Sequence, residues 1–412
     1  MLGPGDDAAV VSAPDGRVAV STDVLIEGRH FRRHWSSGYD VGRKAAAQNL
    51  ADVAAMGAVP TAIVVGLGIP ADLPIPWLDA LTDGFRDECA LVGASVAGGD
   101  ITRCDLVVIG VTVLGDLQGR APVERSGARP GHVIAVAGTL GRSAAGLALL
   151  DSGRVHLSPD RDPYEEAPGS PPPAASGEDR RSPESSASGE ARGSLPPSAY
   201  GEAPGSSLPS APREGRGDPA RPAPGDDQAP TAFSGSGESH APPSPGAGGT
   251  TSGRAASPSA SGAYEDFSDG PRPSGSEGLD ALLREAVGAH LRPRPPYGCG
   301  PEAARLGASA MIDVSDGLLQ DLGHVAKAAG VRIDLDPEAL VVPDAVAAAA
   351  KEVGADPLDW ILTGGEDHAL AAAFPPEVAL PASWRVVGKV SEGDGVHVRG
   401  RAPGPGGWDH FR

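Results

Sequence analysis

The sequence contains few lysines and no phosphate-binding P-loop. Its 412 residues include only four lysines and no Gly-x-x-x-x-Gly-Lys-Ser/Thr segment. A match to the dinucleotide fingerprint, Gly3-x-Gly5-x-x-Ala8, has no strand before it and therefore does not predict a site of that kind. Metal ions, rather than lysines, would have to neutralise any triphosphate that binds here.

An excess of basic residues is also missing. The net charge is −20, and residues 155–278 account for −9 of it with 18 acids and 9 arginines, so the rest of the chain carries −11. A nucleic-acid backbone or an anionic membrane would require a basic face. The charge therefore excludes both as the main partner.

Cysteines and long apolar runs are scarce as well. The three cysteines, Cys89, Cys104 and Cys299, are far apart and odd in number, which argues against a disulfide framework or a zinc site. We interpret them as small core residues. No signal-like N-terminus and no apolar run of transmembrane length occurs, so the sequence predicts a soluble cytoplasmic protein.

A long internal segment divides the chain. From Arg154 to Gly278 the sequence consists mainly of Pro, Ser, Gly, Ala and Glu, without Ile, Met, Cys or Trp. Such a segment buries too little apolar surface to offset its ordering entropy, which predicts a disordered insert. We expect an N-terminal domain over 1–128, a C-terminal domain that begins at 129–153 and continues over 279–412, and the insert over 154–278 between these two parts.

The remaining sequence alternates between strand and helix patterns, which predicts an α/β fold. Expected strands are 18–26, 61–69, 106–114, 133–137, 310–314, 331–335, 360–362, 369–374 and 384–390. Expected helices are 41–56, 77–92, 141–150, 279–291, 301–306 and 317–329. Asn49 and Asp52, three residues apart, should share one helix face.

Six short acidic segments beside glycine or a hydroxyl residue stand out. They are Gly5-Asp6-Asp7, Ser21-Thr22-Asp23, Asn49-Leu50-Ala51-Asp52, Gly98-Gly99-Asp100, Asp313-Val314-Ser315-Asp316-Gly317 and Gly364-Gly365-Glu366-Asp367. Carboxylates are the ligands that Mg²⁺ prefers, and glycines let a phosphate approach the backbone. The segments predict a magnesium-phosphate site, with the amides after Ser315 at a helix N-terminus available to a phosphate.

These segments, in this order, resemble the thiamine-monophosphate kinase family, which lies within the aminoimidazole ribonucleotide synthetase-like superfamily. The resemblance is carried by residues 2–8, 21–31, 44–58, 98–100, 312–318, 362–368 and the terminal Gly-Trp-Asp-His-Phe. It covers nearly the whole chain outside the insert. Family members have a helical segment ahead of the first glycine loop, so either the start lies further upstream or that segment is missing here.

The resemblance implies a two-domain synthetase-like α/β (α+β) fold and ATP-dependent phosphorylation of thiamine monophosphate to thiamine diphosphate. It also implies several Mg²⁺ ions and a homodimer. The implied metal-site residues are Asp7, Ser21, Thr22, Asp23, Asp52, Asp100, Asp313 and Asp316, of which Asp52 and Asp316 would be catalytic. ATP would contact Gly99, Asp100, Arg125 and Ser315, and the thiamine substrate would contact His30, Glu366 and Trp408.

The expected chemistry is direct phosphoryl transfer without a phosphoenzyme. The attacking phosphate is largely ionised near neutral pH because its second pKa is about 6, so no strong general base is required. Two alternatives stay open at this point. One is another ATP-using synthetase of the same superfamily, and the other is a non-catalytic nucleotide- or cation-binding module whose insert recruits partners.

Overall fold

The computed structural model describes residues 11–157 and 276–401, and all of them belong to one compact unit. The predicted disorder of the insert falls mainly on residues 158–275, outside the described residues, as do Asp7 and Trp408. Within the described ranges no helix is long and apolar enough to cross a membrane.

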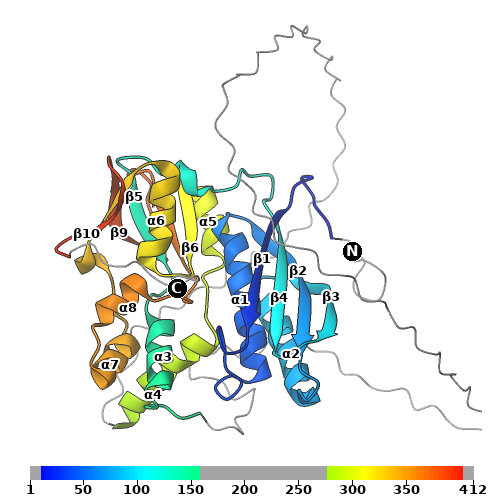
Figure 1. Ribbon diagram of the computed structural model, residues 1–412. Helices are drawn as coiled ribbons and strands as arrows, with labels where there is room; N and C mark the ends of the chain where they lie inside the picture. The colour runs from blue at the N-terminus through cyan, green and yellow to red at the C-terminus, as the bar shows by residue number, and fades with distance from the viewer. Residues whose placement is uncertain (1–10, 158–275, 402–412) are drawn as a thin grey trace, which may run out of the picture. The chain divides into compact units, whose positions relative to one another are not determined.

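A four-stranded sheet forms the N-terminal half of the fold, in the order β1-β4-β2-β3 (Figure 1). Its strands are β1 (Ala19–Ile26), β2 (Val59–Ile69), β3 (Ser95–Arg103) and β4 (Val108–Asp116). β2 and β3 run parallel, and the other neighbours are antiparallel. Helices α1 (Gly38–Ala55) and α2 (Ile75–Ala90) pack against one face, whereas Val20 and Val24 on the opposite face are 60% and 50% exposed.

Helix α1 is the central element because it is buried on nearly all sides. Alanines fill much of it, and Ala45, Ala46 and Ala47 are fully buried. Buried polar residues, among them Lys44 and Asn49, interrupt its otherwise small and apolar surface. Its backbone also approaches α2 closely: a Cβ added to Gly42 would lie 2.1 Å from the Leu81 carbonyl oxygen. Small residues thus allow α1 to pack closely against α2, and larger side chains at these positions would clash.

A six-stranded sheet in the order β10-β7-β9-β5-β8-β6 forms the C-terminal half. Its strands are β5 (Val133–Ala137), β6 (Ala310–Val314), β7 (Arg332–Leu335), β8 (Ala369–Phe374), β9 (Trp384–Ser391) and β10 (Gly395–Val398). Helix α6 (Leu318–Ala329) covers one face. Helix α5 (Cys299–Leu306) covers the other face together with Ala55 at the end of α1, so α1 contacts both sheets.

A separate helical cluster packs beside this sheet. Its members are α3 (Arg142–Asp151), α4 (Ser276–Leu291), α7 (Asp344–Val353) and the neighbouring α8 (Pro357–Thr363). Helices α3 and α4 pack against each other although the expected insert separates them in sequence. Val155 and Leu157 also pack against this cluster, so residues on both sides of 158–275 contribute to its core.

The observed elements differ from the sequence predictions in a few places. Residues 360–362 are not a strand but part of helix α8, because Asp356 caps the helix and Pro357 opens it. Strand β3 was not predicted because its Gly98-Gly99 pair lacks the apolar alternation of a strand. Helix α7 and the four-residue strand β10 were also not predicted.

Candidate active site

Helix α1 presents a row of polar side chains at helical spacing. Lys44, Gln48 and Asp52 are each four residues apart and therefore share one face of the helix. Asn49 stands beside them and is fully buried, with its amide nitrogen donating to the Ala45 carbonyl oxygen at 2.9 Å. Several of the other expected site residues form hydrogen bonds with this row.

Strand β1 contributes two of its residues to this row. The Ser21 hydroxyl donates to the Asp52 carboxylate at 2.6 Å. The Gln48 amide donates to the Asp23 carboxylate at 3.1 Å, and Asn49 accepts from the Asp23 backbone N–H at 3.2 Å. Thr22, between them, points to the opposite sheet face, where its hydroxyl donates to the Val111 carbonyl oxygen. Ser21 and Asp23 are therefore brought to Asp52, and the Thr22 side chain is not.

Asp52 is also close to an acid of the C-terminal half, since α1 lies beside β6. Burial raises the pKa of Asp52 to about 7, and the charges of Asp313 and Asp23 act in the same direction. The hydrogen bond from Ser21 and the charge of His368 oppose this rise. The carboxyl groups of Asp23 on β1 and Asp313 on β6 thus lie close enough to Asp52 on α1 for their charges to affect its ionisation.

Asp313 itself is held by His368. The side chains of both are almost fully buried, and the His368 Nδ1 atom lies 3.2 Å from the Asp313 carboxylate. Although burial opposes it, this contact raises the pKa of His368 overall. The other ring nitrogen, Nε2, is buried without a hydrogen-bond partner among the described residues. A buried unpaired nitrogen costs free energy, so its position beside the acids indicates a place for a further polar group.

The loop after β6 is organised by Asp321, a residue in the first turn of α6. The Asp321 carboxylate accepts the backbone N–H groups of Asp316 and Gly317 at 3.0 and 3.1 Å. Gly317 has φ +117°, and a Cβ there would lie 2.7 Å from the Thr363 carbonyl oxygen, so the position requires glycine. These two amides, expected to receive a phosphate, already have an acceptor. The Asp316 carboxylate accepts from Gln320 at 3.2 Å.

Asp367 caps helix α3 from more than 200 residues away. One carboxylate oxygen accepts the Gly141 N–H at 2.5 Å and the other accepts the Ser143 N–H at 2.9 Å. Burial raises the pKa of Asp367 to about 7, and the two backbone hydrogen bonds act against this rise. The cap ties the loop that carries Glu366 to the start of α3.

Replacing Asp367 with alanine should lower the free energy of unfolding by about 2–4 kcal/mol at pH 8, because two hydrogen bonds to a charged group are lost. Urea unfolding followed by circular dichroism measures the change. Asp151→Asn at the exposed end of the same helix is the control, with a change below about 1 kcal/mol. Equal effects of the two substitutions would show that the remote cap does not stabilise α3.

The residues expected to bind substrate, His30 and Glu366, lie on either side of Lys44. Lys44 donates to the His30 carbonyl oxygen at 3.0 Å and to the Glu366 carboxylate at 2.9 Å. The ring of His30 turns back onto its own loop, where Nδ1 accepts the Ile26 N–H at 3.0 Å. Glu366 has φ +62°, an uncommon backbone conformation outside glycine that tends to occur at functional sites.

Other expected residues lie apart from this group. Gly99 and Asp100 are on β3, the edge strand opposite β1, about 14 Å away across three strand spacings. A Cβ on Gly99 would lie 2.1 Å from the Val65 carbonyl oxygen, so this glycine is required for packing against β2. Arg125 is exposed in the short helix η1 (Arg125–Gly127), which lies against Ser309 at the start of β6, whereas Ser315 follows the end of that strand.

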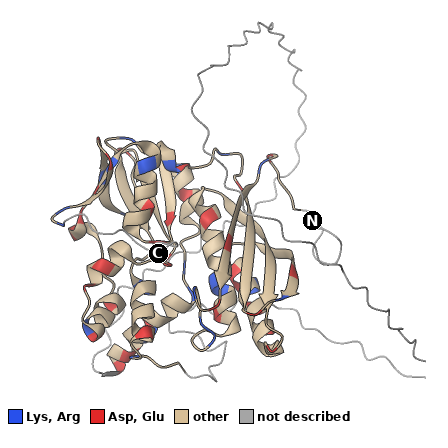
Figure 2. Ribbon diagram, viewed as in Figure 1, with Lys and Arg blue, Asp and Glu red and all other residues tan. Residues whose placement is uncertain are grey.

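The donor set suits a hard cation, but it does not form a closed cage. Asp and Glu residues are spread over both halves of the fold (Figure 2). Among residues 11–157 and 276–401, no three His, Cys, Asp or Glu side chains are placed to hold a metal ion by themselves. Mg²⁺ commonly binds through one or two carboxylates together with substrate phosphates and water, and the mutual repulsion of Asp23, Asp52 and Asp313 is relieved by a cation. The residues present therefore fit magnesium.

Comparison with known proteins identifies the family. The family model for AIR synthase related protein, N-terminal domain, matches residues 5–117. The thiamine-monophosphate kinase of Mycobacterium tuberculosis is 39% identical over 414 residues, which span 100% of this chain and 86% of the relative. The chain belongs to the thiamine-monophosphate kinase family. The resemblance and the kinase class expected from the motifs are confirmed.

Solved structures of lower identity have the same fold. The thiamine monophosphate kinase of Aquifex aeolicus is 23% identical, covers 96% of this chain and 91% of its own, and has a TM-score of 0.61. AaThiL complexed with AMPPCP and TMP is 24% identical, covers 98% and 91% of the two chains, and has a TM-score of 0.63. The synthetase-like α/β fold predicted for this family member is thereby confirmed.

Sequence reasoning did not single out three residues that organise the site: Lys44, Asp321 and His368. Lys44 had a weak signal, because it is one of four lysines and precedes Asp52 by eight residues on the same helix. His368 directly follows the Gly-Gly-Glu-Asp segment. Asp321 sits one turn after Asp316, as a helix-capping acid would.

Proposed function

We propose that this chain transfers the terminal phosphoryl group of ATP directly to thiamine monophosphate, forming thiamine diphosphate. The observation that carries the proposal is the meeting of Asp23, Asp52 and Asp313, three acids from the two halves of a kinase-family chain, in one environment. AaThiL, which has the same fold, has been solved in complex with AMPPCP and TMP. That complex supports the choice of substrates.

The acids would hold Mg²⁺ ions, with Asp52 and Asp316 nearest to the reacting phosphates and Ser21, Thr22, Asp100 and Asp7 as further expected contributors. When bound, magnesium would screen the repulsion between two polyanions and align them for in-line transfer. The described residues prepare that arrangement: Ser21 orients Asp52, Gln48 and Asn49 orient Asp23, and His368 orients Asp313. Arg125, Gly99 and Ser315 remain our proposed ATP contacts, with His30, Glu366 and Trp408 for the thiamine substrate.

No side chain is required as a strong base in this scheme. The acceptor phosphate already bears the charge needed for attack near neutral pH. Asp52, Asp313 and Asp316 therefore act as carboxylates that bind Mg²⁺ near the reacting phosphates. None of them forms a covalent intermediate. We expect no phosphoenzyme after incubation with labelled ATP.

A panel of phosphorylated acceptors with γ-labelled ATP tests the function. We expect the label in thiamine diphosphate, with little label on other phosphate monoesters. Label released only as inorganic phosphate, together with a cyclised product, would support another synthetase of the superfamily instead. Thin-layer chromatography of the products distinguishes the two results.

Replacing residues 158–275 with a short Gly/Ser linker is expected to leave the rate of thiamine diphosphate formation within about twofold of the full chain. The helices on either side, α3 and α4, already pack against each other, and closing a shorter loop costs little. Steady-state kinetics of both chains measures this. Loss of activity with retained folding would assign the insert a part in the reaction.

A homodimer is the oligomeric state we propose. The support is the open face of the N-terminal sheet, where Val20, Val24 and Val64 are 60%, 50% and 38% exposed and no described helix covers them. An exposed apolar sheet face of this kind is typical of an interface. Sedimentation of the wild-type chain and of Val20→Asp tests it.

The predicted domain boundaries and cytoplasmic location stay predictions.

A further inference from the structure

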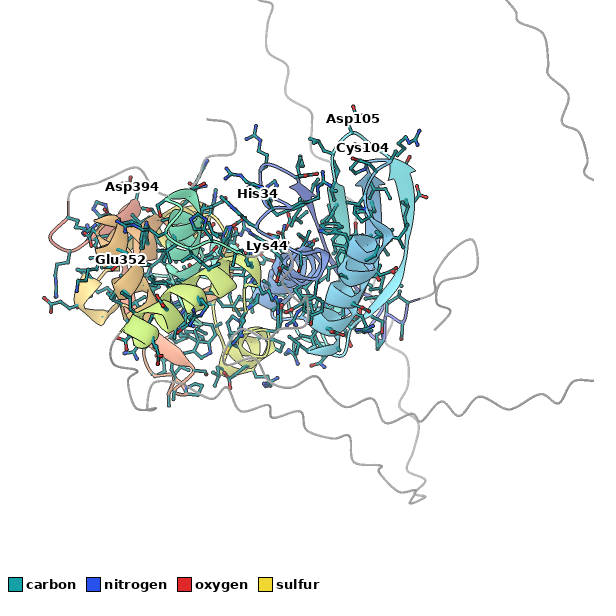
Figure 3. The ribbon with its side chains drawn as sticks, turned by 90° about the horizontal axis from the view of Figure 1, so that it is seen from below. His34, Lys44, Cys104, Asp105, Glu352 and Asp394 are labelled. Carbon is teal, nitrogen blue, oxygen red and sulfur yellow. The ribbon has the colours of Figure 1, made fainter. Side chains whose placement is uncertain are left out.

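Lys44 is a buried cation in the middle of the fold. Its side chain is only 3% exposed. It is one of only four lysines in the sequence. It lies where α1 meets elements of the C-terminal half (Figure 3). A buried ammonium group is costly unless it is paired and hydrogen-bonded.

The partners of Lys44 come from two distant segments of the chain. The ammonium group donates to the His30 carbonyl oxygen at 3.0 Å and to the Glu366 carboxylate at 2.9 Å. His30 follows β1, and Glu366 precedes β8. One side chain therefore fixes the positions of both described residues that we expect to contact the thiamine substrate.

Lys44 also dominates the charge balance of Glu366. His290 lies 3.5 Å from the Glu366 carboxylate, but burial and the charge of Lys44 lower the pKa of His290 to about 3, so this histidine is neutral at physiological pH. Burial alone would raise the pKa of Glu366, whereas the charge and hydrogen bond of Lys44, together with His290 and His368, bring it down to about 2. Lys44 thus makes the largest contribution among the groups that keep Glu366 ionised.

Glu366 retains a free face beyond this ion pair. Its side chain is 31% exposed, compared with 3% for Lys44. Its backbone is pinned by hydrogen bonds of Glu366 N–H and His368 N–H to the carbonyl oxygens of Ser315 and Val314, at 2.7 and 2.9 Å. The carboxylate is therefore held from the interior by Lys44 while part of its surface remains accessible.

We propose that Lys44 is a positioning residue for the thiamine monophosphate site: it holds the His30 segment and the Glu366 segment in one geometry without itself touching the substrate. This rests on the proposed function. A displacement of substrate-positioning groups by about 1 Å commonly costs about 100-fold in efficiency. Loss of Lys44 should therefore affect thiamine monophosphate far more than ATP.

Calorimetric binding and steady-state kinetics of the full chain test this with Lys44→Met, Lys44→Arg and the control Lys351→Met on the exposed surface of α7. For Lys44→Met we expect the Kd and KM for thiamine monophosphate to rise by about 10- to 100-fold, with the Kd of a non-hydrolysable ATP analogue within about twofold of wild type. Lys44→Arg should recover part of the loss. Lys351→Met should bind both ligands as wild type does.

A second variant separates positioning from folding. The double variant Lys44→Met/Glu366→Gln no longer buries an unpaired carboxylate, so its thermal midpoint should return toward wild type while thiamine monophosphate affinity stays low. Unchanged thiamine monophosphate affinity in Lys44→Met, or an equal loss of ATP-analogue affinity, would overturn the positioning role alone. A wild-type chain that bound no thiamine monophosphate would overturn the proposed function and the positioning role together.

Discussion

Replacing Asp52 with asparagine is expected to reduce thiamine diphosphate formation by at least about 10³-fold, equivalent to about 4 kcal/mol of transition-state stabilisation. The unfolding midpoint should stay unchanged or rise. Asp52 is half-buried, close to Asp313 and Asp23, and burial with their repulsion raises its pKa to about 7. Asparagine keeps an oxygen that can accept from Ser21 and removes the repulsion.

A matched acid outside the site provides the control for this experiment. Asp79 on the exposed side of α2 should tolerate asparagine with no change in rate or midpoint. Asp316→Asn should behave like Asp52→Asn in the kinetic assay. Wild-type activity in either site variant would show that the substituted residue has no catalytic role.

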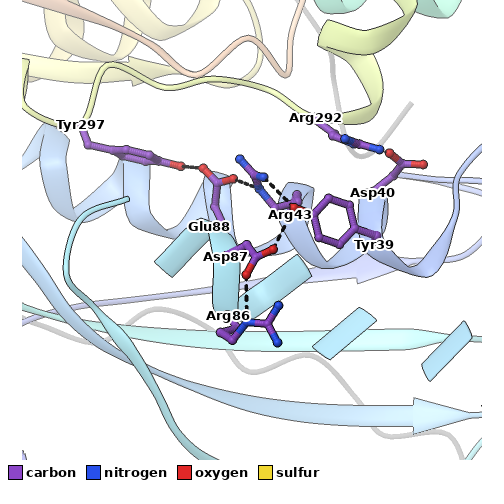
Figure 4. Close-up of polar contacts among 8 residues, drawn as sticks. All are labelled: Tyr39, Asp40, Arg43, Arg86, Asp87, Glu88, Arg292 and Tyr297. Atoms are coloured by element: carbon purple, nitrogen blue, oxygen red, sulfur yellow. Dashed lines mark hydrogen bonds and ion pairs between the residues drawn. The ribbon is translucent and has the colours of Figure 1, made fainter. Parts of the chain in front are cut away.

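Replacing Arg292 with methionine is expected to lower the free energy of unfolding by about 3–5 kcal/mol, because it leaves a buried carboxylate unpaired. Arg292 forms an ion pair with Asp40, whose side chain is 1% exposed, and its guanidinium lies 4.9 Å from the centre of the Tyr39 ring (Figure 4). Asp40 in turn completes the capping box of α1 with Ser37. The pair therefore joins the segment after α4 to the start of the central helix.

Arg86 in the same network is the control. It forms ion pairs with Asp87 (Figure 4) and with Asp83, but its side chain is 62% exposed. Arg86→Met should therefore cost less than about 1 kcal/mol. Urea unfolding of both variants gives the comparison. The double variant Asp40→Asn/Arg292→Met should recover part of the loss, because no buried charge is left unpaired. A small effect of Arg292→Met would mean that Asp40 finds another partner.

Local sequence patterns predicted most elements because apolar spacing determines them. The helix around α1 was predicted from the spacing of Val41, Ala45, Leu50 and Val53, and strand β1 from its apolar, β-branched residues. Helix α8 was mistaken for a strand because three apolar residues, 360–362, fit either structure. The local signal that decides it, Asp356 followed by Pro357, lies just upstream.

Only part of the site could be predicted from the sequence, because several of its contacts join residues that are far apart in the chain. Acids next to glycines could be recognised because their composition is unusual. The contact between Lys44 and Glu366 joins residues 322 positions apart, and no local pattern reports such a pair. The same holds for Asp367, whose partners at the start of α3 are determined by tertiary packing.

The packing of α3 against α4 has a practical consequence for protein engineering. The described part of the chain stops at Leu157 and resumes at Ser276, at the start of a helix that packs against α3. Sites of this kind are where a whole foreign domain can be accommodated, because its two ends need only be close together. A fluorescent protein or a ligand-responsive domain placed between 157 and 276 could thus be used to report on, or control, the catalytic unit without altering its termini.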